Sequence, residues 1–220
     1  MGKLIVIEGL DGCGKSTQLD RLFERLKASD VNCRKVSLPN YGSKACEPVK
    51  MYLNGDFGKT PESVNAYAAS AFYAVDRYAS FKEDWGEFYN NGGIVLCGRY
   101  VTSNVIHQCS KLPQDKWEDF CNWLYDFEYN KMGIPVPDAV LFLNMPQEVS
   151  DKLLATRYGG DESRRDIHES SAEYQKHCRN AAVFAARQKG WISIDCTSDG
   201  TLRSIESIAD EIFDIVKRLI

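Results

Sequence analysis

The sequence contains no long apolar run, no excess of positive charge and no paired cysteines, and each absence excludes a class of protein. A membrane-spanning helix needs roughly 20 consecutive apolar residues, and no stretch approaches that length. A formal net charge of −4 is no electrostatic footprint for nucleic acid, so an anionic ligand has to be bound locally. The eight cysteines form no C-x-x-C pair, which favours reduced thiols over disulfides or zinc.

Targeting signals are missing as well. The first residues lead directly into a strand-like run, which leaves no room for a signal peptide. We therefore expect a cytoplasmic protein whose partners are small molecules, with no nucleic-acid or membrane partner. With 220 residues, of which 44% are hydrophobic and 26% charged, the chain is typical of one globular domain that spans residues 1–220.

Residues 3–17 combine a strand, a glycine-rich loop and the start of a helix. The run Lys-Leu-Ile-Val-Ile at 3–7 is typical of a buried parallel strand. The pattern G-x-x-x-x-G-K-S follows at 9–16 and a helical run begins at Thr17, which is the context of a phosphate-binding P-loop. In such a loop the backbone N–H groups bind phosphate, Lys15 reaches the β- and γ-phosphates, and Ser16 binds Mg²⁺. We therefore expect ATP and Mg²⁺ as ligands. The residues expected to bind ATP are Gly9, Asp11, Gly12, Cys13, Gly14, Lys15, Ser16 and Thr17.

Strand and helix patterns alternate along the rest of the chain. The expected strands are 3–7, 31–38, 94–97, 139–144 and 191–195. The expected helices are 17–26, 61 to about 90, 113–129, 146–157, 166–189 and 201–220, and residues 40–60 are expected to be loop-rich. This alternation predicts an α/β protein with a five-stranded parallel sheet that has helices on both faces.

The helix expected from Pro61 has an apolar stripe and a polar side. The stripe, at the spacing i, i+3, i+4, i+7, consists of Val64, Tyr67, Ala68, Ala71, Phe72, Val75, Tyr78 and Ala79. The opposite side carries Ser70, Tyr73, Asp76 and Arg77. Tyr73 and Arg77 are four residues apart, so a helix places them on one side, one turn apart. Tyr73 lies off the apolar stripe, which favours a role in a site over core packing.

A P-loop alone is compatible with several functions. No N-K-x-D motif occurs, so a guanine-specific switch has little support, and the chain is too short for the larger ATP-driven machines. A second anion site would indicate a kinase. Arg99 follows the strand 94–97, and ligands of open α/β sheets lie beyond the carboxyl ends of the strands. The planar guanidinium of Arg99 suits a phosphate at that position.

Six segments together resemble the thymidylate kinase family over nearly the whole chain. They are residues 7–17, 38–42, 72–77, 98–104, 137–143 and 166–169. The resemblance implies the P-loop nucleotide kinase fold with a short lid, and transfer of the γ-phosphoryl group of ATP to dTMP to give dTDP. It also implies a homodimer, for which the apolar helix 61–81 is the expected interface.

The resemblance further implies roles for single residues. Asp11 contacts the 3′-hydroxyl of the acceptor sugar, and Tyr41 and Arg99 bind its 5′-phosphate. Tyr73 stacks on thymine, and Arg77 donates to thymine O4. The remaining substrate-binding residues are Asn104 at the base edge, His107 beside the ribose and Glu169 in the lid.

The lid, at about 157–166, is expected to supply positive charge to the reaction. Gly12 stands where one subgroup of the family carries an arginine. The missing charge occurs in the lid instead, as Arg157, Arg164 and Arg165, which resembles the other subgroup. An arginine that closes on the transferred phosphoryl group can raise the rate roughly 10³–10⁵-fold. The residues expected to act in catalysis are Lys15, Arg99, Arg157, Arg164 and Arg165.

Three positions depart from the family pattern and leave alternatives open. Gly98 replaces the aspartate that serves Mg²⁺, so Glu8 and Asp11 are expected to orient the waters around the ion. His107 replaces a tyrosine, which predicts weaker exclusion of ribonucleotides, and Asn144 replaces an acid at the end of the fourth strand. The alternatives are a kinase for a different deoxynucleotide, a deoxynucleoside kinase with Glu8 as general base, and a nucleotide-binding switch without turnover.

Overall fold

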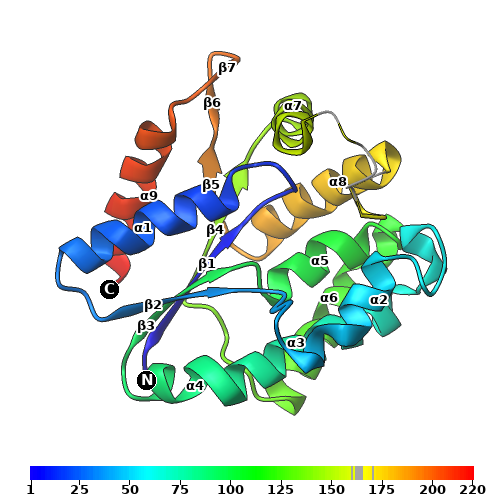
Figure 1. Cartoon of the computed structure of the whole chain (residues 1–220), viewed down its shortest axis with the longest axis horizontal. Helices are drawn as coiled ribbons and strands as arrows, with labels where there is room; N and C mark the ends of the chain where they lie inside the picture. Colours follow the sequence, from blue (N-terminus) through cyan, green and yellow to red (C-terminus); the bar gives the residue numbers. More distant parts are fainter. Residues whose placement is uncertain (160, 162–165, 170) are drawn as a thin grey trace.

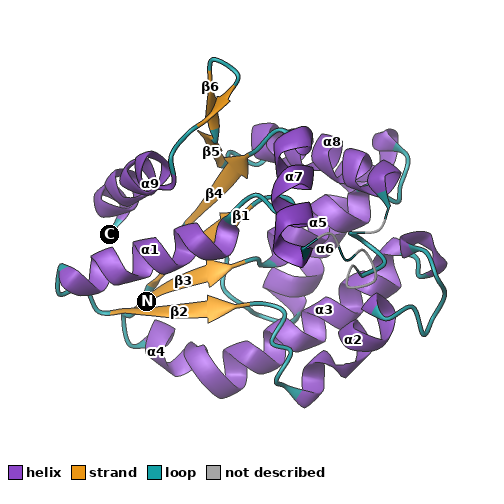
Figure 2. Cartoon of the chain, turned by 45° about the horizontal axis from the view of Figure 1, so that its top comes forward, coloured by secondary structure: helices purple, strands orange, loops and turns teal. Residues whose placement is uncertain are grey.

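The computed structural model shows a parallel sheet with helices on both faces (Figures 1 and 2). It describes residues 1–159, 161, 166–169 and 171–220, except the side chains of residues 157, 158 and 172. The five strands are β1 (Lys3–Glu8), β2 (Cys33–Ser37), β3 (Ile94–Gly98), β4 (Ala139–Asn144) and β5 (Ile192–Asp195). Their order is β2-β3-β1-β4-β5, and every neighbouring pair is parallel. The predicted fold class is confirmed.

Helices connect the strands, and none in the described part of the chain is long and apolar enough to cross a membrane. The α-helices are α1 (Lys15–Ala28), α2 (Glu47–Leu53), α3 (Ala66–Ser80), α4 (Gly86–Asn90), α5 (Val101–Cys109), α6 (Trp117–Tyr125), α7 (Gln147–Tyr158), α8 (Ala172–Gln188) and α9 (Ile205–Leu219). Short 3₁₀ turns are η1 (Lys44–Cys46), η2 (Pro61–Ser63) and η4 (Gln114–Lys116), and π-helical turns are η3 (Phe81–Trp85) and η5 (Asp126–Lys131). A small antiparallel hairpin consists of β6 (Thr197–Ser198) and β7 (Thr201–Leu202).

The strands are apolar on both sides because helices cover both faces of the sheet. Successive side chains of a strand point to opposite faces, so Leu4 and Val6 of β1 belong to one hydrophobic cluster and Ile5 and Ile7 to the other. Helices α5, α6 and α8 pack against the face with Leu4, and α1 and α9 against the face with Ile5 (Figure 1). The eight cysteines, all within the described residues, are buried free thiols.

Two helices were not predicted from the sequence. Helix α2 lies in the stretch 40–60 that was expected to be loop-rich. Helix α5 starts two residues after Arg99, and eight of its nine residues are buried. It buries polar residues along with apolar ones, so the hydrophobic pattern did not separate a core side from a solvent side. The omission matters because α5 carries Ser103, Asn104 and His107.

Among the helices that begin later than predicted, three start behind a capping side chain. Helix α3 starts after Asn65, whose side chain accepts a hydrogen bond from the N–H of Ala68. Helix α8 starts after Ser171 and α9 after Ser204, and both serines cap in the same way. Asn and Ser side chains satisfy N–H groups of the first turn, which explains why the helices begin there.

The polar side of α3 faces the protein, and three residues of the predicted apolar stripe are exposed. Tyr67, Val75 and Tyr78 are 46%, 49% and 40% exposed, whereas Asp76 and Arg77 are buried. Buried charged groups have to be paired or hydrogen-bonded. The polar side of α3 therefore places charged groups in the interior, where they need bonding partners, as expected for a binding site.

Candidate active site

A cavity of about 800 Å³ opens beyond the carboxyl ends of the parallel strands. Strand β1 leads there into the P-loop, and its neighbour β3 leads into Arg99. The predicted site residues that line the cavity are Asp11, Gly12, Cys13, Gly14, Lys15, Ser16, Thr17, Tyr41, Tyr73, Arg77, Arg99, Asn104, His107 and Glu169. The structure thus brings most of the predicted residues to the edge of the sheet where open α/β proteins bind ligands.

A few predicted residues lie elsewhere. Glu8 and Gly9 are buried and do not line the cavity. Arg164 and Arg165 lie outside the described residues, and so does the side chain of Arg157, whose backbone belongs to α7. The catalytic role of these three arginines stays a prediction.

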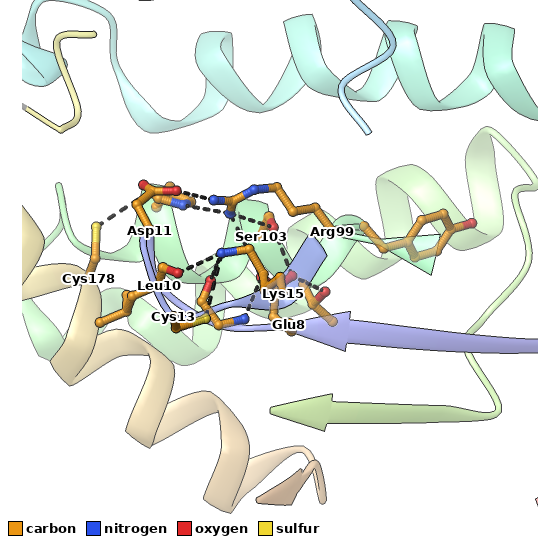
Figure 3. Close-up of polar contacts among 12 residues, drawn as sticks. Glu8, Leu10, Asp11, Cys13, Lys15, Arg99, Ser103 and Cys178 are labelled. Carbon is orange, nitrogen blue, oxygen red and sulfur yellow. Dashed lines mark hydrogen bonds and ion pairs between the residues drawn. The ribbon is translucent and has the colours of Figure 1, made fainter. Parts of the chain in front are cut away.

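The P-loop has the shape that an anion requires. Gly14 precedes α1 with a φ of 88°, and no described atom lies within 4 Å of a Cβ placed on it. No described side chain caps α1, so the first N–H groups of the helix are available to a ligand. The ammonium group of Lys15 donates to the carbonyl oxygens of Gly9 at 2.9 Å and Leu10 at 2.6 Å (Figure 3). Ser16 is exposed at the cavity, where its hydroxyl is free to approach a bound cation.

Arg99 extends into the cavity from a left-handed backbone conformation, with a φ of 64°. Its guanidinium forms an ion pair with Asp11 and contacts the hydroxyl of Ser103 at 3.4 Å (Figure 3). Burial alone would raise the pKa of Asp11, but the charges of Arg99 and Lys15 lower it below its usual range. Asp11 is therefore a carboxylate, and an incoming phosphate would compete with it for Arg99.

Glu8 connects the end of β1 to helix α5. Its carboxylate accepts hydrogen bonds from the hydroxyls of Thr102 and Ser103, at 2.7 Å each, and from the N–H of Gly9 at 3.0 Å. These contacts hold the first residue of the P-loop in a constant position relative to α5. Its predicted role near Mg²⁺ stays a prediction.

His107 forms part of the cavity wall as a neutral ring. It stacks on His168 with the ring centroids 5.3 Å apart and the planes at 14°. Its Nε2 lies 3.3 Å from Nη1 of Arg99. Burial, only partly opposed by the negative charge of Asp11, lowers the pKa of His107 to about 3. At pH 7 the ring therefore adds no charge to the part of the cavity around Arg99.

Arg77 and Asn104, two further residues of the cavity wall, converge on Glu128. Arg77, on α3, donates through Nε and Nη2 to the two carboxylate oxygens of Glu128, at 2.6 Å each. The Nδ2 of Asn104, on α5, donates to Glu128 and to the carbonyl of Ser70, at 3.2 Å each. Arg77 and Asn104 line the cavity, while Glu128 lies fully buried behind them.

The two tyrosines expected at the substrate also lie on the cavity wall. Tyr41 is 53% exposed, and Tyr73 is half-buried beside the cluster of Tyr52, Val64 and Ala69. Burial raises the pKa of Tyr73 well above its usual range, so its ring is neutral and available for stacking. Their substrate contacts stay predictions.

Several residues of the site were missed in the sequence. Glu128 lies between Phe127 and Tyr129 in η5, and an acid flanked by two aromatic residues is the one local signal for its burial. Asp76 and His168 line the cavity although neither was predicted as a site residue. Both belong to segments that carry the family resemblance, so those segments were a better guide than single positions.

The family model of thymidylate kinase matches residues 7–212. This chain belongs to the thymidylate kinase family. The match includes the P-loop, Arg99 and the polar side of α3, so it covers both ends of the cavity. The expected dTMP kinase function is confirmed, and the chain is an enzyme of the phosphotransferase class. A non-catalytic switch and a kinase of different preference are not favoured.

Similar proteins share most of their length with this thymidylate kinase family member. Thymidylate kinase of Mycobacterium tuberculosis (strain H37Rv) is 30% identical over 191 residues, which is 86% of this chain and 87% of the relative. Thymidylate kinase of Plasmodium falciparum is 28% identical over 218 residues, which is 99% of this chain and 91% of the relative. The solved structure of thymidylate kinase from Candida albicans matches with a TM-score of 0.70 at 19% identity, covering 99% of this chain and 92% of that one, and shows the shared fold.

Proposed function

We propose that the cavity transfers the γ-phosphoryl group of ATP to the 5′-phosphate of dTMP. The observation that carries this proposal is that two groups suited to phosphate, the P-loop and Arg99, line one cavity, where Arg99 pairs with Asp11 of the loop. A P-loop binds the donor, and a further arginine suits an acceptor that already carries a phosphate. A nucleoside acceptor would leave Arg99 without that partner.

The donor end is assigned to residues 9–17. On binding ATP, Lys15 would exchange the carbonyls of Gly9 and Leu10 for phosphate oxygens, which form stronger, charge-assisted bonds. Ser16 would hold Mg²⁺, which neutralises charge on the phosphates when bound. Of the two acids proposed to orient waters around the ion, Asp11 lines the cavity and Glu8 is buried beside it.

The acceptor end is assigned to the residues between Arg99 and Arg77. Arg99 and Tyr41 are proposed to bind the 5′-phosphate of dTMP, and Asp11 the 3′-hydroxyl. Tyr73 is proposed to stack on thymine and Arg77 to donate to its O4. Further contacts are assigned to Asn104 at the base edge, His107 at the sugar and Glu169 at the lid.

The remaining positive charge is assigned to the lid. Gly12 supplies none from the P-loop, and Arg157, Arg164 and Arg165 are the arginines of the segment at 157–166. In-line phosphoryl transfer depends on positioning and charge neutralisation, so arginines beside the transferred group are the expected source of rate. This assignment places the chain in the subgroup with lid arginines.

The outward stripe of α3 supports a homodimer. Tyr67, Val75 and Tyr78 expose apolar surface on one side of the helix, and contiguous surface of this kind is typical of an interface. A Val75→Glu variant is expected to elute as a monomer in size-exclusion chromatography, whereas the wild type elutes as a dimer. A monomeric wild type would contradict the proposal. We also propose that the enzyme acts in the cytoplasm, where its thiols remain reduced.

A coupled assay of ADP release tests the proposed function. Its substrates are dTMP, dUMP, dCMP and thymidine, each with ATP and Mg²⁺. We expect turnover with dTMP and none with thymidine, because Arg99 binds the 5′-phosphate. Turnover with thymidine in place of dTMP would indicate a nucleoside kinase, and no ADP release with any acceptor would indicate a binding module.

A further inference from the structure

Glu128 touches both proposed base-reading residues without reaching the cavity itself. Its side chain is 0% exposed and does not line the cavity. It belongs to η5, directly after α6, whereas Arg77 lies on α3 and Asn104 on α5. These helices lie side by side (Figure 1), so one carboxylate joins three separate elements. It lies behind the part of the cavity that Arg77 and Asn104 line, here called the base end.

The partners of Asn104 decide which way its amide faces. A carboxylate in a two-bonded ion pair with arginine only accepts hydrogen bonds, and so does the backbone carbonyl of Ser70. Both contacts of Asn104, at 3.2 Å, therefore require the NH₂ end of the amide. Its carbonyl Oδ1 is the group left for a ligand. A reversed amide would set Oδ1 against two acceptors and lose both hydrogen bonds in a buried place.

Arg77 presents donors to the same part of the cavity. Of its five N–H bonds, two go to Glu128, and one, from Nη1, goes to the carbonyl of Tyr100 at 3.4 Å. One N–H of Nη1 and one of Nη2 are left for a ligand. The cavity therefore offers a donor from Arg77 next to an acceptor from Asn104, and Glu128 orients both.

This pattern distinguishes one pyrimidine from the other. Thymine and uracil carry an acceptor, O4, next to a donor, N3–H. Cytosine carries a donor, its N4 amino group, next to the acceptor N3. The donor of Arg77 and the acceptor of Asn104 match thymine and oppose cytosine at both positions. A base with the wrong pattern leaves buried polar groups unpaired, which is a strong basis for selection.

We propose that Glu128 is the positioning residue that sets this pattern and thereby selects thymine over cytosine. The proposal rests on the proposed function, in which the base lies against Arg77 and Asn104. Glu128 does not touch the base. It acts because its two oxygens can only accept, so the groups that face it have to be donors.

Glu128→Gln tests the proposal, because glutamine has nearly the same shape but replaces one acceptor oxygen with an NH₂ donor. Whichever oxygen it replaces, the new NH₂ meets an N–H donor of Arg77, and in place of Oε1 it also meets the NH₂ of Asn104. The carbonyl of Ser70 is then the one acceptor left to orient Asn104, so the pattern is less strictly imposed. We expect the ratio of kcat/KM for dTMP to kcat/KM for dCMP to fall at least about tenfold, with KM for ATP unchanged. Glu128→Asp keeps a group that only accepts, so the ratio is retained even where both values fall.

Glu118→Gln is the matched control, since it removes the same charge from an exposed position of α6. Its ratio is expected to equal that of the wild type. If Glu128→Gln lowers kcat/KM for dTMP and dCMP in parallel, Glu128 has only a structural role and the proposal is overturned. A ratio that falls equally in Glu128→Asp would also overturn it, because acceptor character would then not be the cause.

If Glu128→Gln does not fold, a measurement on the wild type tests the orientation of the Asn104 amide on which the proposal depends. The side-chain amide protons of Asn104, identified in NMR spectra by their absence from Asn104→Ala, should exchange slowly with and without dTMP. Protons protected only by dTMP would show that the NH₂ faces the base, which overturns the proposal. Because the protection in the free enzyme needs no turnover, a wild type inactive on dTMP would contradict the proposed function separately.

Discussion

Arg99 and Arg77 line the same cavity but are held in opposite ways. The side chain of Arg99 is 21% exposed and that of its partner Asp11 is 16% exposed, whereas the values for Arg77 and Glu128 are 3% and 0%. Water reaches part of the first pair, so a phosphate can compete with Asp11 for Arg99. Glu128 holds Arg77 through two hydrogen bonds of 2.6 Å in a dry place.

Desolvation explains the difference. Removing two charges from water costs several kcal/mol per ion, and only a well-bonded pair recovers that cost. A buried pair therefore keeps its partners, and its remaining donors point in a constant direction. The part of the cavity around Arg99 is therefore built to exchange ion-pair partners (the phosphate end), and the part around Arg77 is a rigid template (the base end).

Lys15→Ala, at the phosphate end of the cavity, should have the largest effect on kcat. Lys15 bonds to loop carbonyls near the cavity, so its loss leaves the core intact and removes charge from the donor phosphates. We expect kcat to fall about 10²–10³-fold or more, with an unchanged melting temperature. Steady-state ADP release and thermal melting measure the two quantities. A kcat near that of the wild type would mean that ATP does not bind at the P-loop.

Breaking the template should cost stability as well as binding. Arg77→Ala leaves the carboxylate of Glu128 buried without its ion-pair partner, so the free energy of unfolding should fall by about 3–5 kcal/mol. Asp11→Asn should lower it by less, because water reaches part of the Arg99–Asp11 pair and the Asn side chain leaves no buried charge of its own. Urea unfolding compares the two variants, and KM values should rise for dTMP far more than for ATP in Arg77→Ala. Equal losses of stability would contradict the comparison.

His107, in the wall of the cavity, should make the stability of the protein depend on pH. The pKa of His107 is about 3 in the folded protein, below the value of 6.5 for a free histidine. The unfolded chain therefore takes up the proton first, and stability is lost as the pH falls below 6.5. Between pH 6.5 and 5.5 the wild type should lose about 1 kcal/mol more than His107→Gln, in which His168 still titrates. Urea unfolding of both proteins at the two pH values measures this difference. Equal losses of stability in the wild type and His107→Gln would show that folding does not lower the pKa of His107.

The smallest effect is expected at Gly98, which replaces the aspartate of the family pattern, and it concerns the requirement for Mg²⁺. A Cβ on Gly98 would lie 3.0 Å from Cδ2 of Leu19, so Gly98→Asp requires a small shift of that side chain. We expect this variant to lower the Mg²⁺ concentration for half-maximal rate by a small factor. Glu8→Gln and Asp11→Asn should raise it. Titration of free Mg²⁺ at saturating ATP measures all four proteins, and superimposable curves would contradict the assigned roles.

Much of the donor end could be predicted because its signals are local. A strand, a glycine-rich loop and a helix follow one another within residues 3–28, and each element has its own pattern. The base end could be predicted only in part. Tyr73 and Arg77 share one side of a helix, which spacing reveals. Helix α5, with Asn104 and His107, buries polar and apolar residues alike, so its sequence does not show which side faces the core. The lid arginines remain predictions from sequence alone.

The P-loop, the alternating strands and helices and the arginine at the end of β3 follow from the sequence alone, because neighbouring residues carry these features. Only the tertiary structure decided that the polar side of α3 faces inward and that Glu128 lies against Arg77. Those two residues are 51 positions apart. A carboxylate in η5 looks in sequence like any surface acid. Its burial depends on how α3, α5 and η5 pack together, and that packing turns an ordinary glutamate into the group that orients the base end of the cavity.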